Sequence, residues 1–271
     1  MSKQKISNKE FVFLAGLPRT GSTLLTSILY QNPKIHTGGN SPVCPIMLGL
    51  FNSCWVNARQ QIFANNAQQK AIDLIASVPH NYYNDVKRPI ILDKCRAWIC
   101  KPNLELITNY ITNSPKFVVM LRPIEEILLS YGYLRTKNKY PTEHGKSWVG
   151  DVFSDLLSEE NREFILTPAE GIIYAKQNFP QNCIFVTYDE LVNNTKQVLK
   201  NIYTFFGWEW FEHNLENIVN KNPENDAAYN LKGQHNIRPQ IGKQKINLQL
   251  PKYLLEAAYE INHKIGIYNG H

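Results

Sequence analysis

Four short apolar runs, each bounded by turn residues, recur along the 271-residue chain. They lie at Phe11–Ala15, Pro89–Leu92, Lys116–Leu121 and Cys183–Thr187. Short runs of this kind are typical of strands buried on both faces of a sheet. Each run is followed by a segment with helical periodicity. These segments are Ser22–Gln31, Pro102–Thr112, Pro123–Leu134 and Leu191–Phe206. The alternation of strand and helix predicts parallel strands with right-handed crossovers.

The expected fold is therefore α/β, as one domain over residues 1–271. It is a three-layer arrangement with a parallel sheet of about four or five strands and helices on both faces. The segments 43–80 and 141–180 are expected to form further helices that cover the sheet. Ligands of such sheets bind beyond the carboxyl ends of the strands. Polar residues follow those ends at 16–22, 93–98, 122–130 and 188–190, and a site is expected there.

Charge and hydropathy narrow the class of protein. The net charge of +6 favours an anionic ligand, but the positive residues are scattered, which argues against a nucleic-acid partner. The first ten residues lack an apolar core, and the apolar run at 11–17 is too short to cross a bilayer. We expect a cytoplasmic protein without a membrane partner. The sequence indicates no oligomeric state.

The stretch GLPRTGST, from Gly16 to Thr23, follows one predicted strand and opens a predicted helix. Its two glycines have the spacing of a phosphate-binding P-loop, but Ser22 stands where that motif has lysine. Unpaired N–H groups at a helix N-terminus attract anions, and Arg19 adds a fixed charge. In nucleoside-triphosphate enzymes the missing lysine reaches the β- and γ-phosphates. Its loss favours a shorter anion.

A second candidate anion site follows the run at 116–121. Arg122 stands at the end of that predicted strand, and Ser130 lies eight residues later, about two turns along the next helix. A cation at a strand end and a hydroxyl farther along can hold a second, separate phosphate. Such an arginine is often a surface ion-pair partner, so the pattern gains its value from occurring together with the first loop.

In these motifs the sequence resembles the sulfotransferases that use 3'-phosphoadenosine 5'-phosphosulfate (PAPS), nearest to the tyrosylprotein-sulfotransferase-like and bacterial branch. Leu17–Leu25 (LPRTGSTLL) is similar to the 5'-phosphosulfate loop of that family. Arg122-Pro-Ile, followed by Ser130, is similar to its 3'-phosphate site. Val186–Gly207 resembles the family segment that is built around Tyr-Glu-Asp-Leu and ends in Phe-Leu-Gly.

The resemblance implies transfer of a sulfuryl group from PAPS to a hydroxyl or amine of an acceptor, without a metal. The acceptor could be a small molecule, a peptide or a carbohydrate. The implied cofactor-binding residues are Arg19, Thr20, Gly21, Ser22 and Thr23 at the phosphosulfate, Arg122 and Ser130 at the 3'-phosphate, and Tyr188 beside adenine. Lys94 corresponds to a family lysine at the transferring sulfonyl group.

The reaction also needs a residue that deprotonates the acceptor. In the tyrosylprotein branch it is a glutamate shortly after the first helix, and the position that resembles it is Asn40. An amide cannot accept the proton, so a different base is needed. Asp93 is the first alternative, and His36 and His235 follow. For a single histidine, a surface or core position is the more common role.

A late basic loop, Leu231–Gln244, is a further candidate. The family closes a late loop over the nucleotide, and here Lys232, Arg238 and Lys243 could serve, with Arg238 as the candidate cofactor-binding residue. A solvated surface loop is the alternative. Arg96 and Trp98 could line the acceptor pocket, or Trp98 could be part of the core.

Two other functions stay open from the sequence. A P-loop kinase would use Asp93, at the end of the run PIILD, to bind Mg²⁺. Ser22 in place of lysine, and Arg122 in place of a further acid, argue against it. A nucleotide-binding protein without catalytic activity is the other possibility, because the expected glutamate is missing.

Overall fold

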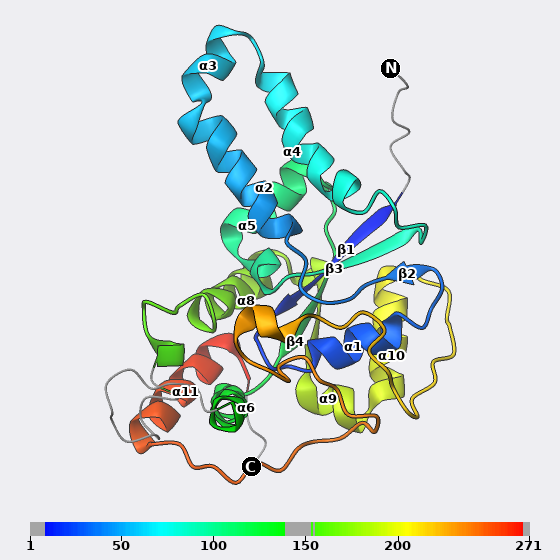
Figure 1. Ribbon diagram of the computed structural model, residues 1–271, viewed down its shortest axis with the longest axis vertical. Helices are drawn as coiled ribbons and strands as arrows, with labels where there is room; N and C mark the ends of the chain where they lie inside the picture. Colours follow the sequence, from blue (N-terminus) through cyan, green and yellow to red (C-terminus); the bar gives the residue numbers. More distant parts are fainter. Residues whose placement is uncertain (1–8, 139–152, 154, 268–271) are drawn as a thin grey trace.

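A computed structural model describes residues 9–138, 153 and 155–267 (Figure 1). Its five strands form one sheet in the order β2-β3-β1-β4-β5, and every neighbouring pair is parallel. The strands are β1 (Glu10–Gly16), β2 (Ile35–His36), β3 (Ile90–Lys94), β4 (Phe117–Leu121) and β5 (Cys183–Thr187). The predicted α/β fold is confirmed. Each apolar run forms a strand, whereas β2 has only two residues and carries no periodic signal.

The register brings the carboxyl ends of the strands to one edge. Leu14 pairs with Lys94, Gly16 with Met120, and Leu121 with Thr187. From β1 the chain first builds β2 and β3 on one side, and then β4 and β5 on the other. The strand order therefore reverses between β1 and β4, where ligands of open parallel sheets bind. The loop after β1 lies at this point.

Helices pack on both faces, which confirms the three layers (Figure 1). One face, with Leu14 and Val118, is covered by α1 (Ser22–Leu29) and α10 (Thr195–Phe206). The other, with Phe13 and Phe117, is covered by a larger group. Its main helices are α5 (Lys101–Tyr110), α6 (Ile124–Lys137), α8 (Leu166–Asn178) and α11 (Lys252–Ile265). Short helical turns lie at Arg96–Ile99, Asp155–Leu157 and Pro180–Asn182.

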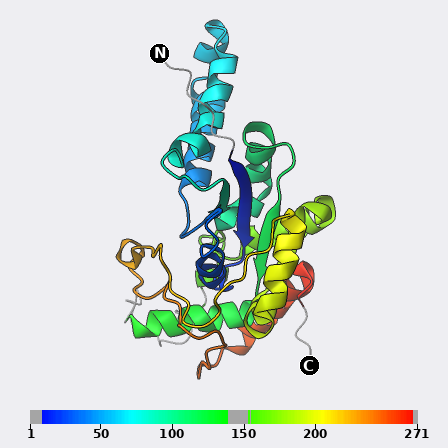
Figure 2. The ribbon, with the colours of Figure 1, turned by 90° about the vertical axis from the view of Figure 1, so that its right-hand side faces the viewer.

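The segment 43–80 is helical, as predicted, but it does more than cover the sheet. It forms α2 (Val43–Asn52), a π-turn (Ser53–Asn57), α3 (Arg59–Ala64) and α4 (Gln68–Tyr82). These helices extend away from the sheet as an arm in both views (Figures 1 and 2). Within the segment 141–180, α8 confirms a helix, while residues 141–152 and 154 lie outside the described residues.

The helix predicted at Leu191–Phe206 is two helices. α9 (Tyr188–Asn193) begins earlier, and Asn194, with a non-helical backbone, separates it from α10. A capping box starts α9: the Thr187 hydroxyl accepts from the Glu190 backbone N–H, and the Glu190 side chain accepts from the Thr187 backbone N–H. This cap fixes the first residue of α9 at the carboxyl end of β5.

Between α10 and α11 the chain runs from residue 207 to 251 with one short helical turn, Asp226–Tyr229. We call residues 218–246 the late segment. Part of it crosses the carboxyl edge of the sheet near α1 and β4 (Figure 1). Long irregular segments are uncommon in compact folds and often belong to binding sites. In the described part of the chain, no helix is long and apolar enough to cross a membrane.

Candidate functional site

The loop between β1 and α1 depends on two glycines. Gly16 (φ 119°) and Gly21 (φ 78°) have backbone angles that side chains disfavour. A Cβ at Gly16 would collide with the backbone carbonyl of Met120, and one at Gly21 would lie 2.9 Å from the Tyr188 ring. Close packing on β4 and on α9 thus requires glycine at both positions.

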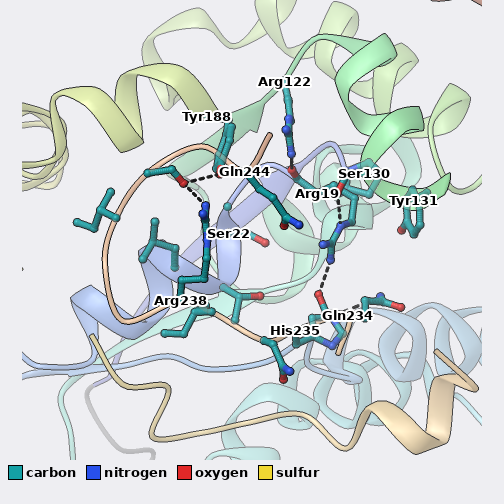
Figure 3. A pocket seen from close by; sticks show the side chains of 18 of the residues that line it. Arg19, Ser22, Arg122, Ser130, Tyr131, Tyr188, Gln234, His235, Arg238 and Gln244 are labelled. Carbon is teal, nitrogen blue, oxygen red and sulfur yellow. Dashed lines mark hydrogen bonds between the residues drawn. The ribbon is translucent and has the colours of Figure 1, made fainter. Parts of the chain in front are cut away.

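The N-terminus of α1 opens into a pocket (Figure 3). Gly21 is its N-cap, and no side chain of the described residues caps the helix. Its first N–H groups are thus suited to an anion. Ser22 and Thr23, which the sequence assigns to the phosphosulfate, line the pocket. Thr20 does not: it is fully buried, and its hydroxyl donates to the Leu17 carbonyl at 3.0 Å, inside the loop.

The two predicted anion sites meet in this pocket. Arg19 Nε donates to Ser130 Oγ at 3.0 Å, and Arg122 Nη1 donates to the Arg19 carbonyl at 2.7 Å. The Arg122 guanidinium lies 4.3 Å from the centre of the Tyr188 ring. Figure 3 shows these four side chains around one cavity. Two of them follow the ends of β1 and β4, and the other two belong to α6 and α9. The structure thus brings together residues that are up to 169 positions apart (188 − 19).

The pocket is strongly cationic. Five of its lining residues are Arg or Lys, and no Asp or Glu lines it among the residues that the structure describes. The cations are Arg19, Lys94, Arg96, Arg122 and Arg238. Burial lowers the pKa of Arg19, and the neighbouring Arg122 lowers it further. Because a buried guanidinium stays charged, it needs a negative partner. The charge of the pocket lining is therefore complementary to an anion.

Lys94 and Asp93 point to opposite faces of the sheet. Lys94, 4% exposed, lines the pocket with its Nζ 3.2 Å from Thr23 Oγ1. Burial lowers its pKa. β3 runs two residues farther than the predicted 89–92, so both residues belong to the strand, and side chains of a strand alternate. Asp93 consequently faces away from the pocket.

The Asp93 carboxylate is enclosed by three donors. Ser41 Oγ and the Tyr83 hydroxyl each donate to it at 2.7 Å, and Trp98 Nε1 donates at 2.6 Å. Burial raises its pKa. Trp98 is fully buried, which is the core role considered for it, whereas Arg96 lines the pocket. The Asp93 carboxylate therefore links three parts of the chain: the loop before α2, the end of α4 and the helical turn Arg96–Ile99.

The late segment closes one side of the pocket. Its Gln234 carbonyl accepts from the Arg19 guanidinium, and Arg238 lines the pocket and donates to the Gly242 carbonyl. The Tyr188 hydroxyl donates to the same carbonyl at 3.3 Å. Figure 3 shows these contacts as dashed lines.

Only one of the three late-loop cations considered from the sequence lines the pocket, namely Arg238. Lys243 pairs with Asp189 at 2.5 Å and with Glu126 at 3.5 Å, and so fastens the late segment to α9 and α6. Lys232 is held through its backbone instead. Its N–H donates to Asn138 Oδ1, and its carbonyl accepts from Asn138 Nδ2.

An acidic residue that the sequence did not single out lies beside the pocket. Glu224 Oε1 accepts from Asn40 Nδ2 and from the Tyr229 hydroxyl, both at 3.1 Å. Glu224 Oε2 lies 3.4 Å from Lys94 Nζ and 3.3 Å from His235 Nε2. No local pattern marks Glu224, because its partner Asn40 is 184 positions away.

His235, one of the histidines considered as a base, lines the pocket and is held by an acid. Its Nδ1 lies 2.6 Å from Asp226 Oδ1, and its backbone N–H donates to Asp226 Oδ2 at 3.1 Å. Burial lowers the pKa of His235, against the opposing charges of Glu224 and Asp226. His36 lies elsewhere, in β2 against the Tyr83 ring, and does not line the pocket.

Known proteins share this sequence pattern and fold. A model of the sulfotransferase family matches residues 12–212. A Caenorhabditis briggsae protein, provisionally assigned as a protein-tyrosine sulfotransferase, is 23% identical over 218 residues, covering 76% of this chain and 69% of that protein.

Solved structures show the same fold. The sulfotransferase domain of the Synechococcus PCC 7002 olefin synthase has a TM-score of 0.57 at 14% identity, covering 100% of this chain and 99% of that chain. A sulfotransferase from Alicyclobacillus acidocaldarius has a TM-score of 0.56 at 12% identity, covering 97% of each chain. The family model covers well over half of the chain, and the chain therefore belongs to the sulfotransferase family.

Proposed function

We propose that this chain transfers a sulfuryl group from PAPS to a hydroxyl or amine of an acceptor. The observation that carries the proposal is the pocket with five cationic side chains and no acidic lining residue among those described, at the carboxyl edge of a parallel sheet. Its donors form two groups, one at the N-terminus of α1 and one around Arg122. PAPS likewise carries two separate anionic groups, so the donor set fits it.

The first donor group is assigned to the phosphosulfate. Gly21, Ser22 and Thr23 would offer N–H and hydroxyl donors, and Arg19 a fixed charge. Thr20 supports the shape of the loop through its bond to Leu17. Lys94, beside Thr23, is assigned to the sulfonyl oxygens. When bound, PAPS supplies an activated sulfuryl group, whose transfer leaves the phosphate with added negative charge. These cations would stabilise that charge.

The second donor group is assigned to the nucleoside. Arg122 and Ser130 would hold the 3'-phosphate, and Tyr188, under the Arg122 guanidinium, would lie beside adenine. Arg238 would contribute from the late segment. Asp93 is assigned no contact with the reacting groups, because its carboxylate is held by Ser41, Tyr83 and Trp98.

The acceptor is proposed to be a small molecule, a peptide or a carbohydrate. The C. briggsae relative, with its protein-tyrosine assignment, supports phenols as the first acceptors to test. The kinase alternative is weakened by Asp93, whose carboxylate faces away from the pocket rather than towards a nucleotide-bound metal. A binding protein without activity would bind the nucleotide and transfer nothing.

The test is calorimetric titration of the full chain with adenosine 3',5'-bisphosphate (PAP), the product nucleotide, and separately with ATP and Mg²⁺. We expect micromolar binding of PAP and no binding of ATP, because only PAP has an isolated 3'-phosphate for Arg122. Binding of ATP with Mg²⁺ and none of PAP would contradict the proposal and favour the kinase.

A further inference from the structure

The proposed reaction needs a base, and the pocket lining contains no carboxylate in the described part of the chain. Glu224 lies directly behind three lining residues and contacts each of them: Asn40, Lys94 and His235. We infer that Glu224, from the late segment, accepts the proton of the acceptor. This inference rests on the proposed function and adds the residue that completes its chemistry.

Lys94 connects Glu224 to the phosphosulfate loop. Its Nζ lies 3.2 Å from Thr23 Oγ1, in the first turn of α1, and 3.4 Å from Glu224 Oε2. A base has to reach the acceptor atom that attacks the group held by Lys94. One lysine that touches both the loop and the carboxylate places Glu224 at that point.

The two oxygens of Glu224 differ in how firmly they are held. Oε1 accepts two hydrogen bonds of 3.1 Å, from Asn40 and Tyr229, which fix the orientation of the carboxylate. Oε2 lies 3.4 Å from Lys94 Nζ and 3.3 Å from His235 Nε2, and both distances are longer than the two hydrogen bonds of Oε1. When Lys94 contacts the sulfonyl group of bound PAPS, its contact with Glu224 Oε2 weakens, and Oε2 is the oxygen that can accept a proton.

Backbone packing also fixes the position of Glu224. A Cβ at Gly39 would collide with the Glu224 side chain, so the approach requires glycine at that position. Next to it, Asn222 packs on Gly38 and donates to the Thr37 carbonyl at 3.0 Å. The late segment is therefore seated on residues 37–40, and the carboxylate is placed by backbone contacts as well as by hydrogen bonds.

Glu224 is ready to act as a base because it is ionised. Burial acts to raise its pKa, but the charges of Lys94 and His235 and the Asn40 hydrogen bonds hold the pKa below its ordinary value. The groups that face it are Lys94 from β3, Asn40 from the loop after β2, and Tyr229 and His235 from the late segment, with Asp226 behind His235.

Glu224 Oε2 takes the proton of the acceptor hydroxyl, and the acceptor oxygen forms a bond to sulfur. The bond between sulfur and the 5'-phosphate oxygen breaks, and its electron pair stays on that oxygen. The products are the sulfated acceptor, PAP and protonated Glu224, which returns the proton to solvent.

Position 40 provides a direct test. The sequence resemblance expects a glutamate there, and here Asn40 instead donates to a glutamate at 224. Amide and carboxylate can be exchanged across this contact with the double variant Asn40→Glu/Glu224→Gln. Glu224 lies outside the residues 12–212 that match the family model.

The experiment compares the wild type, Glu224→Gln, the exchange variant and the control Glu216→Gln, an exposed glutamate of the same part of the chain. PAP affinity is measured by calorimetry. Turnover of PAPS is measured with phenol, which is neutral at the assay pH, with p-nitrophenol at a pH where it is ionised, and with water alone as acceptor.

We expect Glu224→Gln to bind PAP as tightly as the wild type or more tightly, since a negative charge near Lys94 is removed. Transfer to phenol and to water should fall by about 10²- to 10⁴-fold, the usual effect of a general base. Transfer to ionised p-nitrophenol should fall by less than about tenfold, because no proton is removed. The exchange variant should regain at least about tenfold of the lost phenol activity, and Glu216→Gln should match the wild type.

Three outcomes would overturn the inference while PAP binding persists. Unchanged turnover in Glu224→Gln would show that another group is the base. Equal losses with phenol and p-nitrophenol would show a structural role. If neither phenol is a substrate, unchanged hydrolysis of PAPS by Glu224→Gln decides against Glu224. Absence of PAP binding by the wild type would instead overturn the proposed function.

Discussion

Arg122→Ala is the variant that most directly tests the assignment of the nucleotide pocket. The side chain is 12% exposed and has three neighbours in the structure. Its Nη1 donates to the Arg19 carbonyl at 2.7 Å, its Nε donates to Glu126 at 2.9 Å, and its guanidinium lies 4.3 Å from the centre of the Tyr188 ring. Removing it therefore affects the proposed 3'-phosphate contact and also the fit of the loop and of the tyrosine.

These two effects have different sizes and different ligand dependence. A hydrogen bond to a charged group contributes about 1.5–3 kcal/mol, which corresponds to a loss of about 10- to 150-fold in affinity. The contacts with the Arg19 carbonyl and Tyr188 are ordinary in strength, and losing them should cost about 1 kcal/mol, or roughly fivefold. The first loss applies only to a ligand with a 3'-phosphate, whereas the second applies to any adenosine 5'-phosphate.

The assay is calorimetric titration of the wild type and Arg122→Ala with PAP and with AMP, which differs from PAP only in lacking the 3'-phosphate. We expect the variant to lose about 10- to 150-fold more affinity for PAP than for AMP. Arg59→Ala, which removes the same charge from the exposed surface of α3, should alter neither affinity. Equal losses for PAP and AMP would refute the assignment of Arg122 to the 3'-phosphate.

Two further predictions concern stability. Gly16→Ala should lower the unfolding temperature in a thermal melt by at least about 4 °C, because φ is 119° and the new Cβ meets the Met120 carbonyl. Gly49→Ala, at an exposed position of α2 where a Cβ meets nothing within 4 Å, should instead stabilise the protein by about 0.5–1 kcal/mol. An unchanged melt for Gly16→Ala would contradict the account of the loop. His213 is buried with Nε2 2.9 Å from the Tyr203 hydroxyl, and burial lowers its pKa. The unfolded chain therefore binds the extra proton from about pH 6.5 downward, so the free energy of unfolding in urea should fall as the pH drops from about 7.5 to about 5.5. His213→Gln should make this fall shallower, and an identical slope in both proteins would contradict it.

The sequence predicted the sheet well because its signals are local. Runs of at least four apolar residues recur before helical periodicity, and this pattern suffices for β1, β3, β4 and β5. The anion-binding candidates were also local, since Arg19, Arg122 and Tyr188 each follow directly or closely on a strand. In a parallel sheet all such positions meet at one edge, so the prediction of one pocket followed from the topology.

The sequence placed the end of one strand, β3, wrongly, and this small shift changes where two side chains lie. β3 ends at Lys94, two residues later than predicted. Because Asp93 lies inside the strand and side chains of a strand alternate, its carboxylate faces Ser41, Tyr83 and Trp98. Of the two neighbours Asp93 and Lys94, Lys94 is the one that lines the pocket. Strand boundaries are the least certain part of a prediction from pattern, because the end of a strand is set by hydrogen bonds to its neighbours.

The late segment could not be predicted for a different reason. It has no hydrophobic periodicity, and its contacts join distant parts of the chain: Gln234 is 215 positions from Arg19, and Glu224 is 130 positions from Lys94. The basic residues of Leu231–Gln244 drew attention to the loop, yet only Arg238 lines the pocket. Glu224, the proposed base, lies outside that stretch.

The late segment contacts the proposed nucleotide pocket and the proposed base through adjacent residues. The Gln234 carbonyl accepts from Arg19, and the next residue, His235, contacts both Glu224 and Asp226. A deletion or a bulky substitution here would thus shift Arg19 and the Glu224 carboxylate together, and loss of activity would not reveal which one mattered. Glu224→Gln keeps the shape of the side chain and changes only its charge. For this reason the variant can separate loss of proton transfer from loss of nucleotide binding.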